Sequence, residues 1–170
     1  MKIMFISDIH GDLESLKIVK SIYDKEHIDR VIILGDVYYG NFYNYEDIDK
    51  VLLSFKDPIV TKGNCDSETD CMTSKVPFFD HIYDEFFNKR FFCSHGHKYN
   101  ITRYPDKEFD VMVNGHTHIG MIEKFDNKIF LNPGSISRPR GESKKSFMII
   151  DDNGIYLKDL DNNIIDKLLW

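Results

Sequence analysis

The fold is decided by the stretch Met1-Lys2-Ile3-Met4-Phe5-Ile6-Ser7-Asp8-Ile9-His10-Gly11. Its apolar, β-prone residues are bounded by polar residues and a glycine, which predicts a buried strand. A carboxylate, Asp8, and an imidazole, His10, lie two positions apart just past the carboxyl end of this strand. Open α/β sheets bind ligands beyond the carboxyl ends of their strands. The pair therefore predicts the first half of a metal site.

Helices and strands alternate in the chain that follows. Asp12 is the predicted N-cap of a helix, with Glu14 in the first turn, where a negative charge suits the helix dipole. Further strands are expected at residues 30–34 and 58–61, with a helix at 46–55 between them. The order strand, helix, strand, helix, strand predicts parallel βαβ units.

The pattern changes after Val76 to short strand-like runs separated in part by hairpin-type turns. We find no linker, repeat or low-complexity tract, so we expect one domain over residues 1–170 with a mixed, two-sheet core. The runs cover residues 78–86, 90–93, 110–113, 121–125, 128–131, 146–150 and 155–160.

Composition narrows the class of protein. A chain of 170 residues with 42% hydrophobic residues is long enough for one globular domain with a core of its own. The formal net charge of -6 argues against DNA or an anionic membrane as the main partner. The three cysteines are odd in number and form no CxxC pair, which predicts a reducing cytoplasm. No segment is long enough to span a bilayer.

Potential metal ligands recur at the ends of the strand-like runs. A single Asp or His at the end of a strand is weak evidence for a metal site. We therefore set aside His27 and His81, which have no other potential metal ligand beside them in the sequence. Together, carboxylate, imidazole and amide groups suit Mn, Fe, Ni, Co or Zn better than calcium. They are too numerous for one tetrahedral ion, and two ions that share a carboxylate would use them all. The residues are Asp8, His10, Asp36, Asn64, His95, His97, His116 and His118.

Five motifs in this order resemble the signature of the calcineurin-like metallophosphoesterases, nearly from end to end of the chain. Two further stretches resemble the small bacterial YfcE-type phosphodiesterases of that family: Gly63-Asn64-Cys65-Asp66-Ser67-Glu68, and Asn132-Pro133-Gly134-Ser135 followed by Pro139. The five motifs are Asp8-x-His10, Gly35-Asp36, Gly63-Asn64, His95-Gly96-His97 and Gly115-His116-Thr117-His118.

The resemblance implies an α/β fold, a four-layer α-β-β-α sandwich with two mixed β-sheets. It also implies two divalent metal ions per chain. Mn²⁺ is the expected metal, and Ni²⁺, Co²⁺, Zn²⁺ or Fe²⁺ would also suit the site. By this analogy one ion takes Asp8, His10, Asp36 and His118, and the other takes Asp36, Asn64, His95 and His116, with Asp36 bridging.

The activity implied is that of a metal-dependent phosphodiesterase acting on small phosphodiesters. A hydroxide held between the two metals would attack phosphorus in line, without a covalent enzyme intermediate. A phosphomonoesterase or nuclease with the same metals remains an alternative, since loops set substrate choice. A non-catalytic scaffold of the same fold is a further alternative, but all seven ligand positions are filled here, which favours an enzyme. We expect no sequence-specific nucleic-acid binding and allow for a homo-oligomer.

The roles of several residues beside the predicted metal ligands are open between catalysis and structure. The predicted catalytic residues are Asp36, Asn64, Cys65 and His97. Many relatives outside the subgroup carry a histidine where Cys65 stands. Its thiol could act as an acid near the metals, but we favour a small buried filler that is dispensable for catalysis. Asp66 could orient a ligand or substrate, or cap its turn. His97 could touch substrate or lie behind the ligands.

Two loops complete the predictions. Arg138 and Arg140 suit bidentate contact with phosphate, but arginines on a loop are more often solvated. The aromatic loop from Tyr38 to Tyr45 could form a lip over the metals, a partly buried loop or a subunit contact. For this loop we favour a lip or a dimer contact. Cys71 and Cys93 are interpreted as small apolar fillers.

Overall fold

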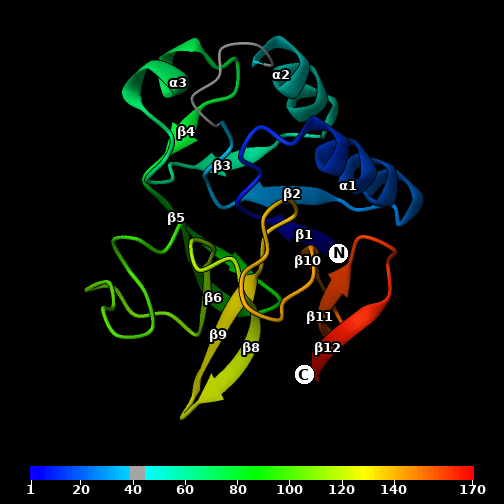
Figure 1. Cartoon of the computed structure of the whole chain (residues 1–170). Coiled ribbons are helices and arrows are strands. Elements are labelled where there is room, and N and C mark those ends of the chain that lie inside the picture. The colour runs from blue at the N-terminus through cyan, green and yellow to red at the C-terminus, as the bar shows by residue number, and fades with distance from the viewer. Residues whose placement is uncertain (39–44) are drawn as a thin grey trace.

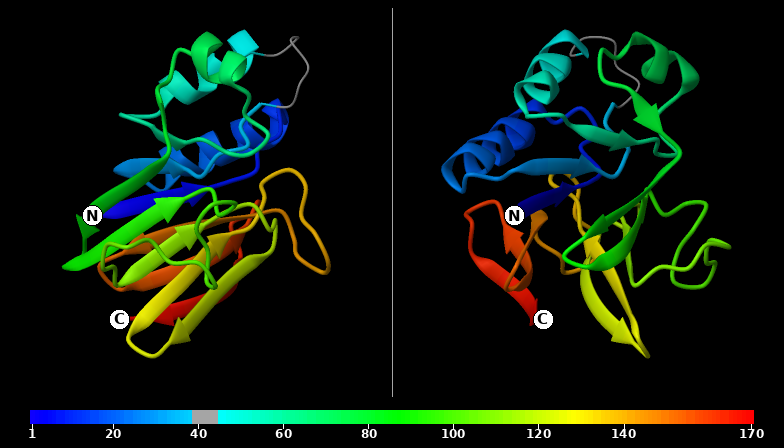
Figure 2. Two further views of the ribbon diagram at one scale, coloured as in Figure 1. Left: turned by 90° about the vertical axis from the view of Figure 1, so that its left-hand side faces the viewer. Right: turned by 180° about the vertical axis from the view of Figure 1, so that it is seen from behind.

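The computed structural model describes residues 1–38 and 45–170. Two β-sheets pack face to face, and the helices lie on the outer side of the first sheet (Figures 1 and 2). This arrangement agrees with the predicted α/β fold with two mixed sheets.

The first sheet combines the N-terminal and C-terminal parts of the chain. Its strand order is β12-β11-β10-β1-β2-β3-β4. Strands β1 to β4 are parallel to one another, while β10 lies antiparallel beside β1. The bounds are β1 Lys2–Ile6, β2 Arg30–Ile33, β3 Ile59–Thr61, β4 Phe78–Phe79, β10 Ser146–Asp151, β11 Gly154–Asp159 and β12 Ile164–Leu169.

The second sheet has the order β5-β6-β7-β9-β8. Its three central strands β6, β7 and β9 run parallel, and β5 and β8 close it at the edges as antiparallel hairpin partners. The bounds are β5 His81–Phe86, β6 Lys89–Ser94, β7 Val111–Asn114, β8 Gly120–Phe125 and β9 Lys128–Pro133.

Strand β1 is buried on both faces, as its unbroken apolar run predicts. Because side chains alternate along a strand, Ile3 and Phe5 face the second sheet and pack in one core with Phe91 and Val111. Met4 and Ile6 face the helices and belong to the other core, with residues of α1 such as Leu16.

Within the part of the chain that the structure describes, three helices cover the outer face of the first sheet: α1 Leu13–Lys25, α2 Tyr45–Ser54 and α3 Glu68–Thr73. The side chain of Asp12 accepts a hydrogen bond from the backbone N–H of Ser15 at 3.0 Å, which confirms the predicted N-cap of α1. Helix α3 begins with a capping box between Ser67 and Asp70. None of the helices described is long and apolar enough to cross a membrane.

The outer face of the second sheet is covered by irregular chain. Phe92, Met112 and Phe130 point outward from this sheet and pack with Phe109 from the segment that precedes β7. Among the described residues no helix lies between β6 and β7. The outermost layer on this side is therefore a loop that carries its own aromatic contacts.

Several element predictions need correction. The single strand expected at 78–86 is two strands in different sheets: Asp80 separates β4 from β5, and its carboxylate pairs with Lys98 at 2.8 Å. Helix α3 and strand β12 were not predicted, because α3 is only 6 residues long and β12 interrupts its apolar residues with Asp166-Lys167.

Tyr38 differs from the predicted exposed aromatic lip. It is 2% exposed, belongs to the core under the helices, and its hydroxyl contacts Asp49 and Ser74. Tyr45 begins α2, and its ring stacks on that of Tyr38. The rest of the loop, residues 39–44, lies outside the described residues.

Candidate metal and active site

The predicted ligands all follow the carboxyl ends of parallel strands. Asp8 and His10 come after β1, Asp36 after β2 and Asn64 after β3, while His95 follows β6, and His116 and His118 follow β7. Carboxyl ends of parallel strands share one edge of a sheet. Because the two sheets pack face to face, the structure brings the ligands from both sheets together at one edge.

Four of these residues form a buried cluster. Asp8, His10, Asp36 and His118 each offer one ligand atom, and these atoms lie within 4.8 Å of one another. The Nε2 atoms of His10 and His118 are 3.2 Å apart, and Oδ1 of Asp8 lies 3.1 Å from Nε2 of His118. Nε2 of His10 lies 3.7 Å from Oδ2 of Asp36.

A second group adjoins the first through Asp36. Oδ2 of Asp36 lies 3.4 Å from Nε2 of His95, which in turn lies 3.0 Å from Oδ1 of Asn64. The ring of His116 is 5.1 Å from that of His95, measured between centroids. The same Asp36 oxygen thus faces a histidine of each group, the position that a bridging carboxylate requires.

Backbone carbonyls fix the orientation of two of the histidines. Nδ1 of His95 lies 2.6 Å from the carbonyl oxygen of Leu34, and Nδ1 of His118 lies 2.6 Å from that of Arg138. A carbonyl only accepts, so in each ring Nδ1 carries the hydrogen. When the ring is neutral, Nε2 then presents its lone pair to the cluster, as metal-ligating histidines do.

These donors fit divalent metal ions. Ligand atoms about 2.0–2.2 Å from a shared ion stand roughly 3 Å apart, close to the separations observed between Asp8, His10 and His118. Oδ1 of Asp8 is buried and has no hydrogen-bond donor when the ring of His118, 3.1 Å away, is neutral. A buried carboxylate oxygen without a donor is costly, and a cation would supply the missing partner.

The charges of the site are strongly coupled. Burial alone would raise the pKa of Asp36, but His95 and the N–H of Cys65 hold it well below its usual range. The Asp8 carboxylate raises the pKa of His118. Burial lowers the pKa of His95, yet Asp36 more than offsets this, so the net shift is upward. Burial lowers the pKa values of His10 and His116.

The backbone of the site is strained. Five of the seven predicted ligands have positive φ: Asp8 at 54°, His10 at 47°, Asp36 at 51°, His116 at 68° and His118 at 63°. Such angles are uncommon outside glycine and cluster at functional sites. The strand-end turns are therefore held in shapes that aim the side chains inward.

Two glycines permit the close approach of these turns. A Cβ at Gly63 would lie 2.0 Å from Oδ1 of Asp36, and one at Gly115 would lie 1.8 Å from Oγ of Ser7. Both spaces are too small for any other residue.

Asp66 anchors the turn that carries Asp36. Its carboxylate is 2% exposed and accepts hydrogen bonds from the backbone N–H groups of Asp36, Val37 and Gly63 at 2.8 Å each, and of Tyr38 at 3.3 Å. Of the two roles left open for Asp66, the geometry favours orientation of a ligand, exerted through the backbone.

Other positioning residues come from the Asn132–Ser135 turn, for which the sequence suggested no role. Nδ2 of Asn132 donates to the carbonyl oxygen of Gly115 at 2.7 Å and to Oγ1 of Thr117 at 3.0 Å, so it holds the loop of His116 and His118. Oγ of Ser135 donates to the carbonyl oxygen of Asp8 at 2.8 Å. The Asn-Pro-Gly-Ser motif is visible in the sequence. The groups that Asn132 and Ser135 contact lie more than ten residues away along the chain, so the motif alone does not reveal them.

Cys65 and His97 both border the site. Cys65 is exposed, so its interpretation as a buried filler is wrong. Its backbone N–H donates to Oδ1 of Asp36 at 2.8 Å, and burial together with Asp36 raises the pKa of its thiol to about 11. The ring of His97 lies 5.4 Å from that of His95, with Nδ1 buried and without a hydrogen bond. Of the other two cysteines, Cys93 is a core filler and Cys71 is only half-buried.

Residues 1–154 match the family model of the calcineurin-like phosphoesterase superfamily domain. The chain belongs to this superfamily. The phosphodiesterase YfcE of Escherichia coli K12 is 32% identical over 166 residues, which cover 90% of this chain and 89% of that protein. The probable metallophosphoesterase YsnB of Bacillus subtilis is 27% identical over 96% of this chain and 99% of its own.

Solved structures agree with this assignment. The structure of the E. coli phosphoesterase YfcE superposes with a TM-score of 0.88 at 30% identity, covering 99% of each chain. Vacuolar protein sorting 29 of Cryptosporidium parvum has a TM-score of 0.71 over 99% of this chain and 98% of its own, at 19% identity. At that identity the likeness shows the fold alone.

Proposed function

We propose that this chain is a metal-dependent phosphodiesterase that hydrolyses small phosphodiesters with two divalent ions, Mn²⁺ being the expected metal. The observation that carries the proposal is the pair of adjoining donor groups that share Oδ2 of Asp36. One group consists of Asp8, His10, Asp36 and His118, and the other of Asp36, Asn64, His95 and His116.

Two bound divalent ions would activate water for in-line attack on phosphorus and neutralise the charge that develops there. The protein's part is to fix the donors. The carbonyls of Leu34 and Arg138 hold Nδ1–H of His95 and His118, and the backbone N–H of Cys65 fixes Oδ1 of Asp36. Oδ2 of Asp36 is then left to face both groups.

His97 and Asn64 are the proposed substrate-side residues. Asn64 is exposed at the mouth of the site, and its Oδ1 faces Nε2 of His95. His97 stands 6.3 Å from His116 between ring centroids, beyond the donor groups themselves. We assign the thiol of Cys65 no acid role: its Sγ accepts a hydrogen bond from Nδ2 of Asn64 at 3.4 Å, and the contact of Cys65 with Oδ1 of Asp36 is made by its backbone N–H.

The whole of residues 1–170 is proposed to act as one catalytic domain. The C-terminal strands β10, β11 and β12 are not an appendage, because β10 pairs directly with β1, which carries Asp8 and His10 at its end. The phosphodiesterase YfcE of Escherichia coli K12 matches over 90% of this chain.

A non-catalytic scaffold role for the same fold is the rival proposal. Against it stands the donor set, which has a carboxylate, imidazole or amide at every predicted position. A chain with no catalytic role would not need five of these positions in positive-φ backbone.

Hydrolysis of bis-p-nitrophenyl phosphate and p-nitrophenyl phosphate tests the proposal. Protein treated with a chelator should be inactive, and Mn²⁺ should restore cleavage with a higher kcat/KM for the diester. A preference for the monoester would make the chain a phosphatase instead. Absence of cleavage with Mn²⁺, Ni²⁺, Co²⁺, Zn²⁺ or Mg²⁺ would leave the scaffold role.

A further inference from the structure

Arg140 lies beside the donor groups, in a segment that forms two hydrogen bonds with His118. Its backbone N–H donates to the carbonyl oxygen of His118 at 3.2 Å, while the carbonyl of Arg138 accepts from Nδ1 of the same histidine. The loop that contains Arg140 is therefore fixed to the site on both sides of His118.

The guanidinium of Arg140 makes no ion pair with any carboxylate in residues 1–38 or 45–170. Other arginines of this acidic chain do: Arg30 pairs with Asp84 at 3.1 Å, and Arg90 pairs with Asp110 and Glu108 at 2.8 Å each. Arg140 is exposed, so its five N–H donors are available to an anion from solution.

The backbone contact of Arg140 with His118 also sets its charge near the donor groups, because Nε2 of His118 lies 3.1 Å from Oδ1 of Asp8. An arginine within electrostatic reach of a proposed phosphoryl site, and free of carboxylates, has the chemistry for a non-bridging phosphate oxygen.

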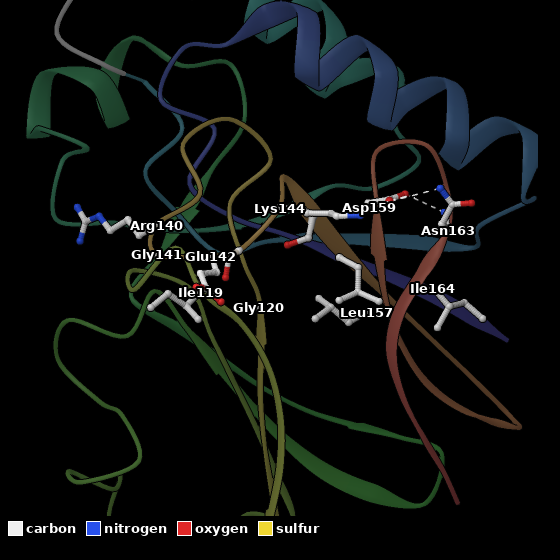
Figure 3. A pocket seen from close by; sticks show the side chains of 13 residues that line it. Ile119, Gly120, Arg140, Gly141, Glu142, Lys144, Leu157, Asp159, Asn163 and Ile164 are labelled. Atoms are coloured by element: carbon white, nitrogen blue, oxygen red, sulfur yellow. Dashed lines mark hydrogen bonds and ion pairs between the residues drawn. The ribbon is translucent and has the colours of Figure 1, made fainter.

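A pocket of about 750 Å³ adjoins the same arginine, a size typical of small-molecule sites. Figure 3 shows Arg140 at one end, with Ile119, Leu157 and Ile164 among the apolar side chains of the walls. Ile119 directly follows His118, so the wall begins at the donor group itself.

We propose that Arg140 contacts a non-bridging oxygen of the bound phosphodiester, and that the pocket over Ile119 receives the ester group that stays on phosphorus. This rests on the proposed phosphodiesterase function and narrows its substrate class to diesters that carry a sizeable apolar ester group, such as an aryl group.

The first test is Arg140→Ala, with Arg140→Lys and the control Lys124→Ala. Loss of a charged hydrogen bond should lower kcat/KM for bis-p-nitrophenyl phosphate by about 10–100-fold, mainly through a higher KM, with metal content unchanged. Lys124→Ala removes an exposed positive charge that lies outside the pocket, on β8, so it should change kcat/KM less than about threefold. Arg140→Lys should recover part of the loss, because it keeps the charge without the planar fork.

Chemical rescue separates contact from structure. Free guanidinium, below concentrations that unfold the protein, should restore activity to Arg140→Ala and leave the wild type unchanged. Full activity of Arg140→Ala, or an equal loss in Lys124→Ala, would overturn the role of Arg140. Inactivity of the wild type with every metal would instead overturn the proposed function.

The pocket is tested with two substrates that share one leaving group, bis-p-nitrophenyl phosphate and methyl p-nitrophenyl phosphate. The ratio of their kcat/KM values should favour the aryl ester in the wild type and should fall in Ile164→Ser. Ile164 is 53% exposed, so this change should leave the fold intact. A ratio that does not change in Ile164→Ser would overturn the assignment of the pocket.

Discussion

At the scale of single residues, the site depends on where each oxygen and nitrogen points. Asp36 illustrates this: Oδ1 is held by the backbone N–H of Cys65, which leaves Oδ2 between His10 and His95. The backbone amide of Cys65 therefore has a clear function, while its thiol has none that the geometry requires.

Cys65→Ala should retain activity on an aryl diester within about tenfold of the wild type, because alanine keeps the backbone N–H. A general acid contributes about 10²–10⁴-fold, so a loss of several hundred-fold would show that the thiol takes part in proton transfer. Steady-state kinetics with bis-p-nitrophenyl phosphate measures this.

Proton release on metal binding should depend on pH. The pKa values of His95 and His118 are raised above the ordinary 6.5, so in the metal-free protein both rings keep their protons to a higher pH than ordinary histidines. The stability that these imidazolium ions contribute is fully present below pH 6.5. It is lost as pH rises through the raised, folded-state pKa values. A metal must displace the protons.

Calorimetric titration of Mn²⁺ into the chelated protein, in buffers of different ionisation enthalpy, gives the number of protons released. We expect more protons per chain at about pH 6.5 than at about pH 8.5. An equal number at both would contradict the raised pKa values of the two histidines.

At the scale of elements, the parts that a local pattern defines were predictable. Strand β1 and the cap of α1 depend on neighbouring residues, and so does the placement of Asp8 and His10. The break between β4 and β5 was not predictable, because the apolar run continues through it and only pairing with different sheets separates the two strands. The role of Asp66 was equally hidden, since three of its four donors lie 28 to 30 residues away.

Asp66→Asn should lower the free energy of unfolding by about 2–3 kcal/mol, because the amide group would face backbone N–H groups that need an acceptor. Asp29→Asn is the matched control. Asp29 accepts one exposed hydrogen bond from the backbone N–H of Lys2, and its loss should cost less than about 1 kcal/mol. Urea unfolding of the metal-free proteins compares them, and equal stabilities would refute the anchoring role of Asp66.

At the scale of the whole molecule, the site exists because two sheets present their strand ends at one edge. Strands of the first sheet are followed by Asp8, His10 and Asp36, and strands of the second sheet by His95, His116 and His118. The donors therefore come together only when the two sheets pack against each other. The resemblance of the motifs to the family signature predicted these residues as candidate ligands from the sequence. The distances between sheets could not be predicted, because they depend on contacts such as those between Phe5 and Phe91.

The most direct measurement is a titration of the chelated protein with Mn²⁺, in which bound metal and hydrolysis of bis-p-nitrophenyl phosphate are followed together. Activity should rise to a plateau at two ions per chain in the wild type. In Asp36→Asn it should be at least about 100-fold lower with weaker binding of metal, since even partners of metal ligands are worth about 10–100-fold. A plateau at one ion per chain, or near-normal turnover in Asp36→Asn, would contradict a binuclear site bridged by Asp36.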